Sequence, residues 1–490
     1  MSRESAFGFL RENYLIVLIV LLGAALRFYG LGREGIWYDE AISIHVSKLG
    51  FSDIIRWVFN NSAETNPPFY YMILSPWIAV FGDSEAVSRM PSAIFGSLSV
   101  IAIYALGKLL YGKRAGLIAA LILAVSFFHI KYAQEARGYT LMVCLILVSY
   151  YSFLRLTMMR RSTLYTVAYV VSTALLVYTH YYGTMIILAQ NIFCFTLLLR
   201  KRKIGEIGLG GWIKLQAMTG LVLLPGFVFL AVIALKIQKG FWVPEPSTEA
   251  VWIFFKIYAG SIYLLIVFLA FSVYSFAGLR KGKPANVKKS GKTSTESAPE
   301  AGLSEGEKLY MLLVWTAVPI LVPYLISLVS SPILIFRYTI GSSLAFYLLV
   351  SKGVTNMNDR RLIAAAAGLI LILSFYTLAS YFSSVGKHQW RELMAYVESN
   401  AGLGDIIVVS PPNERVTAEY YHKRKDLKII PLGRKFPTFE NLGRRNIWFI
   451  FHAHPESRAN TRAGLGRQYD ITEIGFNRLD LFRLSKKQNN

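Results

Sequence analysis

The sequence predicts a polytopic α-helical membrane protein that carries a small C-terminal α/β soluble domain. Of its 490 residues, 54% are apolar and only 17% are charged, a balance typical of multi-pass membrane proteins. Apolar runs long enough to cross a bilayer recur until about residue 382, and the composition changes after that point. We therefore expect a membrane module over residues 1–382 and a separate domain over residues 383–490.

About eleven apolar runs are predicted to span the bilayer. The run 67–81 is shorter and contains Pro76, so we expect an interfacial or re-entrant helix there. Helical spacing of apolar residues after Glu40 and after Phe51 predicts two more interfacial helices, although short packed helices would show the same spacing. The predicted spans are 14–30, 89–111, 115–133, 137–157, 162–180, 182–199, 212–235, 251–279, 308–329, 335–352 and 361–382.

The distribution of basic residues predicts the orientation in the membrane. The net charge of +23 lies in short blocks between apolar runs, which favours cytoplasmic loops over a nucleic-acid partner. If 67–81 does not span, every strong basic block falls on one face, including residues 200–203 and the linker 280–307. That linker lacks an apolar period and is predicted to be a flexible cytoplasmic loop. We expect a plasma-membrane protein with a cytoplasmic N-terminus and an extracytoplasmic C-terminal domain.

The C-terminal region alternates between predicted helices and strands. HQWRELMAYVESN and ERVTAEYYHKR are typical of helices, whereas DIIVVS, LKIIPL and NIWFIFH are typical of strands. No GxGxxG or P-loop motif supports nucleotide binding. His452 and His454 form an HxH pair without an identifiable third ligand, which favours a solvated strand end over a metal site. Cys144 and Cys194 lie inside apolar runs, so neither a disulfide nor a cysteine nucleophile is expected.

The first predicted outer loop contains two adjacent acids, Asp39 and Glu40, in the stretch LGREGIWYDEAISIH. Acids next to a bilayer are costly unless they are paired or used. The stretch is therefore interpreted as the catalytic loop of a membrane enzyme, and a solvated loop with ordinary surface acids is the alternative.

The predicted topology gathers further polar residues at the same face of the membrane. Helix caps and the interfacial aromatic belt could account for single members of this set, the tyrosines above all. They do not explain why acids, arginines and a histidine meet on one face while the other carries lysine-rich blocks. The set comprises Asn66, Tyr70, Glu135, Arg137, His180, Tyr181, Arg337 and Tyr338.

An enzyme at the outer face needs a donor that is delivered through the membrane, because nucleotide-activated donors are normally absent there. A sugar linked to a polyprenyl phosphate meets this need. Its buried phosphate requires cationic partners, for which the arginine fork is well suited. The acceptor hydroxyl must lose a proton as it attacks the anomeric carbon, and a positioned carboxylate can accept that proton.

Several motifs resemble those of the GT-C superfamily of membrane glycosyltransferases. They are WYDEAIS, NPPFYYMIL, RMPSAIFGSLSVIAIYALGKLLYGKRAG, FFHIKYAQEARGYTLM and YTHYYG, in that order over residues 10–200. The resemblance is to the branch of the dolichyl-phosphate-mannose protein mannosyltransferases and the lipid A aminoarabinose transferase. Relatives use polyprenyl-phosphate sugars and generally invert the anomeric centre.

The resemblance implies a role for each residue of the set. Asp39 would be the general base or acceptor-positioning acid, and Glu40 its adjacent partner. Glu135 lies in the turn between the third and fourth predicted spans, where relatives have a second acidic residue. Arg337 and Tyr338 would contact the lipid phosphate, and Arg137, His180, Tyr181, Asn66 and Tyr70 would complete the donor site. Asn66 stands where relatives often have His or Lys.

The expected function is therefore hexosyl or pentosyl transfer from a polyprenyl-phosphate donor to a protein, glycolipid or cell-surface glycan. No metal site or required cofactor is predicted, although a carboxylate pair could hold Mg or Mn. A transporter or lipid flippase is the alternative, but internal repeats and mid-span polar residues are not seen. In a third interpretation the C-terminal domain binds partners and the membrane module is inert.

Overall fold

The computed structural model describes residues 3–61, 64–158, 162–238, 243–281, 302–384, 386–432, 446–452 and 455–487. Contacts divide the chain into two compact units. Unit 1 comprises Met1–Tyr29, Phe51–Met72 and Met90–Tyr381, and unit 2 comprises Gly30–Gly50, Ile73–Arg89 and Phe382–Asn490. The predicted C-terminal domain thus lies in unit 2, together with two stretches of the predicted first outer loop. Most of the predicted 280–307 linker lies outside the described residues.

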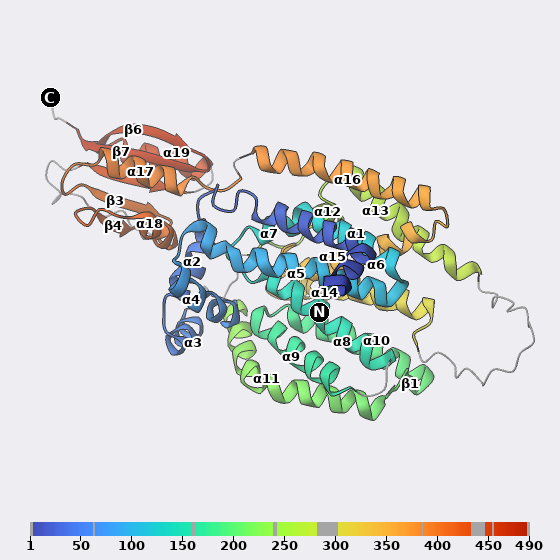
Figure 1. The fold of residues 1–490 in the computed structure, drawn as a ribbon. Helices are drawn as coiled ribbons and strands as arrows, with labels where there is room; N and C mark the ends of the chain where they lie inside the picture. The colour runs from blue at the N-terminus through green and yellow to red at the C-terminus, as the bar shows by residue number, and fades with distance from the viewer. Residues whose placement is uncertain are drawn as a thin grey trace, which may run out of the picture. The chain divides into compact units, whose positions relative to one another are not determined.

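Unit 1 is a bundle of helices (Figure 1). Helices α4 (Phe69–Phe81), α5 (Glu85–Tyr111) and α16 (Arg360–Ser383) have residues in both units. The other helices of unit 1 are α1 (Arg3–Phe28), α3 (Phe51–Asn60), α6 (Lys113–Val125), α7 (Phe127–Ala133), α8 (Tyr139–Met158), α9 (Thr163–Thr179), α10 (Gly183–Lys201), α11 (Leu209–Gln238), α12 (Ala250–Ala259), α13 (Ile262–Tyr274), α14 (Glu305–Val329) and α15 (Ile340–Thr355), and the short elements are β1 (Lys203–Ile204), β2 (Ile207–Gly208) and η1 (Ser275–Lys281).

Each of the eleven predicted spans coincides with a helix or with a bent pair of helices. Within the described residues, six helices are long and apolar enough to cross a membrane, and the number rises to eight if each bent pair is one span. The predicted spans at 14–30, 162–180 and 335–352 coincide with shorter apolar helices. The predicted interfacial helix at 67–81 is the 13-residue helix α4.

Two predicted spans are not continuous helices, which corrects the sequence interpretation. Helices α6 and α7 meet at an angle of 58° at Ser126, whose extended backbone ends α6 and whose hydroxyl caps α7. The break leaves carbonyl groups of α6 without their helical partners, and inside a membrane such groups need another donor. The buried Arg27 of α1 supplies it, because its guanidinium donates to Leu123 O at 2.9 Å and to Ala124 O at 3.0 Å.

The predicted span at 251–279 bends by 96° between α12 and α13. Gly260 ends α12 with φ +91°, a left-handed conformation that a residue with a side chain rarely adopts. Ser261 then caps α13 by accepting a hydrogen bond from Leu264 N at 3.2 Å. The sequence pattern missed both bends because apolar composition continues through them.

The C-terminal part of unit 2 is a five-stranded mixed sheet of order β4-β3-β5-β7-β6. Strands β4, β3 and β5 are parallel, and β7 and β6 continue the sheet in antiparallel fashion. The predicted helices and strands are present, and α19, β6 and β7 were not predicted. The elements are α17 (Trp390–Asn400), β3 (Ile406–Ser410), η2 (Pro412–Glu414), α18 (Arg415–Tyr421), β4 (Lys428–Pro431), β5 (Ile447–Phe451), α19 (Pro455–Leu465), β6 (Tyr469–Phe476) and β7 (Leu479–Lys486).

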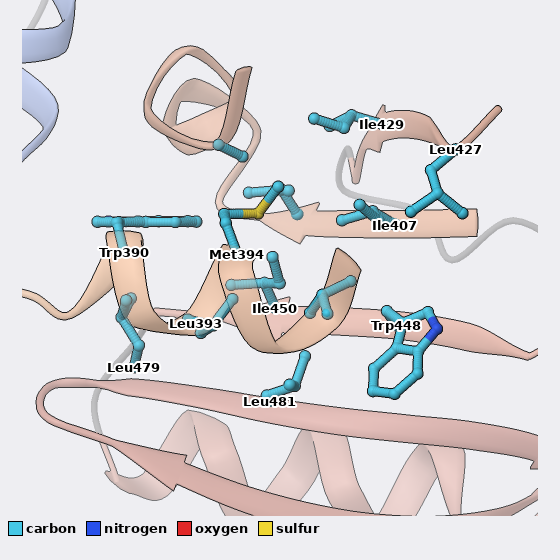
Figure 2. Packing of buried hydrophobic residues seen from close by; sticks show 13 residues of the cluster. Trp390, Leu393, Met394, Ile407, Leu427, Ile429, Trp448, Ile450, Leu479 and Leu481 are labelled. Carbon is cyan, nitrogen blue, oxygen red and sulfur yellow. The ribbon is translucent and has the colours of Figure 1, made fainter. Parts of the chain in front are cut away.

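Alternating residues of the central strands form two cores, one on each face of the sheet. Ile407 and Val409 of β3 belong to one core, and Ile406 and Val408 belong to the other. Figure 2 shows the first core, in which Trp390, Leu393 and Met394 of α17 pack against the strands. Residues of the predicted first outer loop join unit 2 through α2 (Tyr38–Ser47), whose Ala41 and Ile44 pack against α18.

Candidate functional site

A small pocket in unit 1 is formed by three segments that are far apart in the sequence. These segments are the start of α4, the turn between α7 and α8 and the turn between α9 and α10. The lining residues are Asn66, Pro67, Tyr70, Tyr71, Arg137, Gly138, Tyr139, Thr179 and His180. Four of the predicted donor-site residues, Asn66, Tyr70, Arg137 and His180, therefore lie around one pocket.

The turn that carries Arg137 is fixed by contacts from α4 and α5. Ser92 Oγ donates to Arg137 O at 3.0 Å, and the Tyr70 hydroxyl lies 2.9 Å from the same Oγ. Gly138 follows in close contact, since a Cβ there would lie 3.1 Å from Thr179 Cγ2 and 3.2 Å from Tyr70 Cβ. The side chain of Arg137 is itself buried. The turn thus presents a buried cation from a rigid support.

His180 presents a hydrogen-bond donor to this pocket. Its Nδ1 accepts a hydrogen bond from Tyr182 N at 3.2 Å, so in the neutral ring the proton lies on Nε2. Burial lowers the pKa of His180 to about 3, and the charges of Arg137 and Arg337 act in the same direction. The ring is therefore neutral near pH 7, and its Nε2 has no hydrogen-bond partner among the described residues.

Aromatic side chains surround His180, and one of them, Tyr338, comes from the segment that precedes α15. The ring of His180 lies 4.6 Å from that of Tyr338 and 4.8 Å from that of Tyr181. Arg337 lies over the Tyr338 ring, 5.6 Å from its centroid. The hydroxyl of Tyr181 is buried and has no hydrogen-bond partner in the described part of the chain. Two arginines, a neutral histidine and two tyrosines are thus gathered in unit 1.

The predicted second acid, Glu135, lies in the same turn as Arg137. Its side chain is buried, and its carbonyl oxygen accepts a hydrogen bond from Arg137 N at 2.8 Å. Its catalytic role stays a prediction.

The sequence interpretation missed Glu64 and Tyr71. Glu64 is buried, and its carboxylate accepts hydrogen bonds from the backbone and side chain of Asn66, both at 2.7 Å. It also accepts a hydrogen bond from the Tyr71 hydroxyl at 3.0 Å. Its position two residues before Asn66 was the available signal, because an acid so close to an apolar segment is costly when it is unpaired.

The two adjacent acids of the predicted first outer loop lie in unit 2, in the first turn of α2. Asp39 is half-buried, and its carbonyl oxygen accepts a hydrogen bond from Ser43 Oγ at 3.0 Å. Its predicted role as a base is not tested by these contacts.

Glu40 is fully buried and has two cationic partners. Arg89 donates to both carboxylate oxygens, at 2.7 and 2.8 Å, and Lys387 donates to one of them at 2.9 Å. Burial alone would raise the pKa of Glu40, but Arg89 and Lys387 outweigh burial and lower it to about 2. Arg89 also donates to the carbonyl oxygens of residues 31, 34 and 35. Glu40 is thus the centre of an ion-pair cluster that holds the 31–35 segment.

No group of three or more His, Cys, Asp and Glu side chains that could hold a metal ion occurs within the described ranges. His452 instead pairs with Glu414, with 3.0 Å between Nδ1 and Oε1, while His454 of the predicted HxH pair lies outside the described residues.

Residues 65–243 match the family described as dolichyl-phosphate-mannose-protein mannosyltransferase. The match covers a little over a third of the chain. The matched region contains all of the residues that line the pocket, Asn66, Tyr70, Arg137 and His180 among them. The resemblance inferred from the motifs is therefore confirmed.

One relative is an uncharacterized protein of Aquifex aeolicus (strain VF5), which is 30% identical over 150 residues. That match covers 29% of this chain and 30% of the relative, so it spans less than a third of either protein.

Solved structures share the fold of this chain. The apo structure of ArnT from Cupriavidus metallidurans has a TM-score of 0.65 at 11% identity and covers 98% of both chains. ArnT from the same organism bound to undecaprenyl phosphate gives 0.58 at 12% identity, covering 96% of this chain and 98% of that one. The oligosaccharyltransferase of Archaeoglobus fulgidus gives 0.55 at 15% identity, covering 85% of this chain and 62% of that one.

Proposed function

We propose that the protein transfers a sugar from a polyprenyl-phosphate-linked donor to an acceptor at the extracytoplasmic face of the plasma membrane. The proposal rests on the pocket in unit 1, which combines the buried Arg137 with the Nε2–H of His180. A similar fold, that of ArnT from Cupriavidus metallidurans, has been solved with undecaprenyl phosphate bound. The acceptor class is left open among proteins, glycolipids and cell-surface glycans.

The charges near the pocket fit the demand of the reaction. When the acceptor oxygen attacks the anomeric carbon, the bond between that carbon and the phosphate oxygen breaks, and polyprenyl phosphate leaves with one more negative charge. Arg137, Arg337 and the His180 N–H are suited to stabilise this developing charge, because preorganised donors in a buried site need no reorganisation. Because Tyr182 N donates to Nδ1 of His180, the neutral ring carries its proton on Nε2 and can donate it to the phosphate.

The proton of the acceptor hydroxyl requires a base, and we assign this role to Asp39. The support is the motif resemblance around Asp39 and its half-buried place in the first turn of α2. Attack with inversion releases one proton from the acceptor and one polyprenyl-phosphate anion. One carboxylate is therefore enough, because only one proton has to be accepted. We assign Glu40 to positioning, because Arg89 and Lys387 occupy both of its oxygens. Glu135 remains a candidate second acid for orienting the acceptor.

The topology that we propose has eleven spans, with α6–α7 and α12–α13 each counted as one. The N-terminus is then cytoplasmic and the C-terminal domain extracytoplasmic, as the basic blocks indicate.

The experiment is transfer from a radiolabelled undecaprenyl-phosphate hexose to membrane acceptors by the purified full-length protein. Asp39→Asn should abolish transfer while donor binding persists. The matched control is Asp53→Asn, because Asp53 is an exposed acid on α3 and should be dispensable. Equal transfer by the wild type and Asp39→Asn would remove Asp39 from the chemistry. Donor binding without turnover under all conditions, together with lipid movement across vesicles, would favour the transporter or flippase alternative.

A further inference from the structure

Glu64 is a buried acid beside the pocket to which the proposed chemistry gives no role. It accepts three hydrogen bonds, two from Asn66 and one from Tyr71, and both donors line the pocket. A buried carboxylate needs such partners to remain charged. The same bonds fix the orientation of the residues that donate them.

The contact with Asn66 determines which end of its amide group is directed toward Glu64. A carboxylate only accepts hydrogen bonds, so the Nδ2 group of Asn66 must face Glu64, as the 2.7 Å contact shows. The Oδ1 atom then lies on the opposite side of the amide. Asn66 consequently offers an acceptor, which pairs with a sugar hydroxyl and not with a phosphate oxygen.

The contact with Tyr71 links Glu64 to the cationic Arg137. Because the Tyr71 hydroxyl donates its proton to Glu64, its lone pairs accept from another donor, and Arg137 Nη1 lies 3.4 Å away. Glu64 thereby supports Arg137 through Tyr71 while it orients Asn66 directly.

A lysine of α11 anchors this segment of the chain. Lys236 Nζ donates to Val58 O and Asn61 O at 2.8 Å and to Glu64 O at 3.1 Å. These contacts satisfy carbonyl groups at the end of α3 and place a positive charge near the buried acid. The orientation of Glu64 is therefore supported from a distant part of the sequence.

We propose that Glu64 is a positioning residue that divides the pocket into two parts: Asn66 is set to accept a hydrogen bond from the donor sugar, and the anionic phosphate is left to Arg137 and His180. This inference rests on the proposed function. It predicts that Glu64 and Asn66 determine the preference for sugar-linked lipid over bare lipid phosphate.

The test compares equilibrium binding of undecaprenyl phosphate with that of undecaprenyl-phosphate glucose and undecaprenyl-phosphate mannose to the full-length protein. Asn66→Ala should weaken binding of at least one sugar-linked lipid about tenfold and change binding of bare undecaprenyl phosphate less than twofold. Glu64→Gln, whose amide can also donate, should shift the same preference in the same direction. Combining the two substitutions should reduce the preference no further than Asn66→Ala alone, because Glu64 acts on the sugar through Asn66. Glu206→Gln, at an exposed glutamate of unit 1, is the matched control and should change nothing.

Equal weakening of all the lipids by both variants would overturn the division of the pocket, and so would unchanged binding of all of them. Additive effects in the double variant would also contradict it. Asn66→Ala keeps Glu64 in place, so it tests the proposal even if Glu64→Gln lowers the amount of folded protein. If the wild type binds neither class of lipid, the proposed function itself fails. Binding of undecaprenyl phosphate without preference for its sugar-linked forms would overturn only the Glu64 proposal.

Discussion

The ion-pair cluster of Glu40 permits a quantitative test of whether this acid is structural or catalytic. In Glu40→Gln the cations Arg89 and Lys387 would lose their buried anion. The fall of the Glu40 pKa from 4.5 to about 2 corresponds to about 3 kcal/mol in favour of the ionised form. Breaking a buried pair by removing one partner typically costs a similar 3–5 kcal/mol. We therefore expect Glu40→Gln to destabilise unit 2 by about 3 kcal/mol.

The assay is thermal unfolding of the full-length protein in detergent, combined with hydrogen exchange of peptides covering residues 31–47. A loss of about 3 kcal/mol should lower the Tm of a unit of this size by roughly 6–12 °C. Exchange should rise in the 31–35 segment, since Arg89 holds its carbonyl groups. Glu419→Gln, at an exposed acid of α18 that pairs with the exposed Arg415, is the matched control.

The pH dependence follows from the lowered pKa of Glu40. Because the folded pKa is depressed, the stabilisation is complete above about pH 4.5 and is lost as the pH falls toward about 2. Wild-type unfolding should show this loss, and Glu40→Gln should not. An unchanged Tm in Glu40→Gln with abolished transfer would refute the structural assignment and make Glu40 a catalytic residue.

Four further outcomes are expected. Replacing His180 by Phe, which keeps a ring but has no N–H, should weaken donor binding about 10–100-fold through loss of a hydrogen bond to a charged group. Because the pKa of His180 is about 3, binding by the wild type between pH 5 and 8 should show no His180 titration, and a transition near pH 6.5 that the variant lacks would contradict this. Arg337→Ala should weaken donor binding by about 2–4 kcal/mol if it contacts a desolvated phosphate, and an unchanged donor KM would exclude that contact. Arg27→Met should lower the Tm, because carbonyl groups at the α6–α7 break lose their donor at about 1–3 kcal/mol each, whereas an unchanged Tm would show that another donor replaces it. A single cysteine at the exposed Ser247, in a background without Cys144 and Cys194, should react with an impermeant reagent added from outside, and labelling only after permeabilisation would invert the proposed topology.

The sequence by itself determined the helical elements and most of the residues of the pocket. Apolar runs specify membrane helices because a bilayer selects for length and hydrophobicity, so the predicted ranges coincide with helices. The motif order located Asn66, Tyr70, Arg137 and His180, which the fold brings to one pocket. In the C-terminal part, the short apolar runs in DIIVVS, LKIIPL and NIWFIFH predicted the strands β3, β4 and β5, because a strand that is covered on both faces is apolar at successive positions.

Only the tertiary structure decided how the polar groups pair. The breaks at Ser126 and Gly260 depend on backbone conformation and on donors such as Arg27, which lies about a hundred residues from the carbonyl groups that it satisfies. Two adjacent acids look equivalent in sequence, but Glu40 is buried against Arg89 and Lys387 whereas Asp39 is half-buried. Pairing of buried charges is a long-range property of the fold, and a local pattern of residue types does not encode which charges meet.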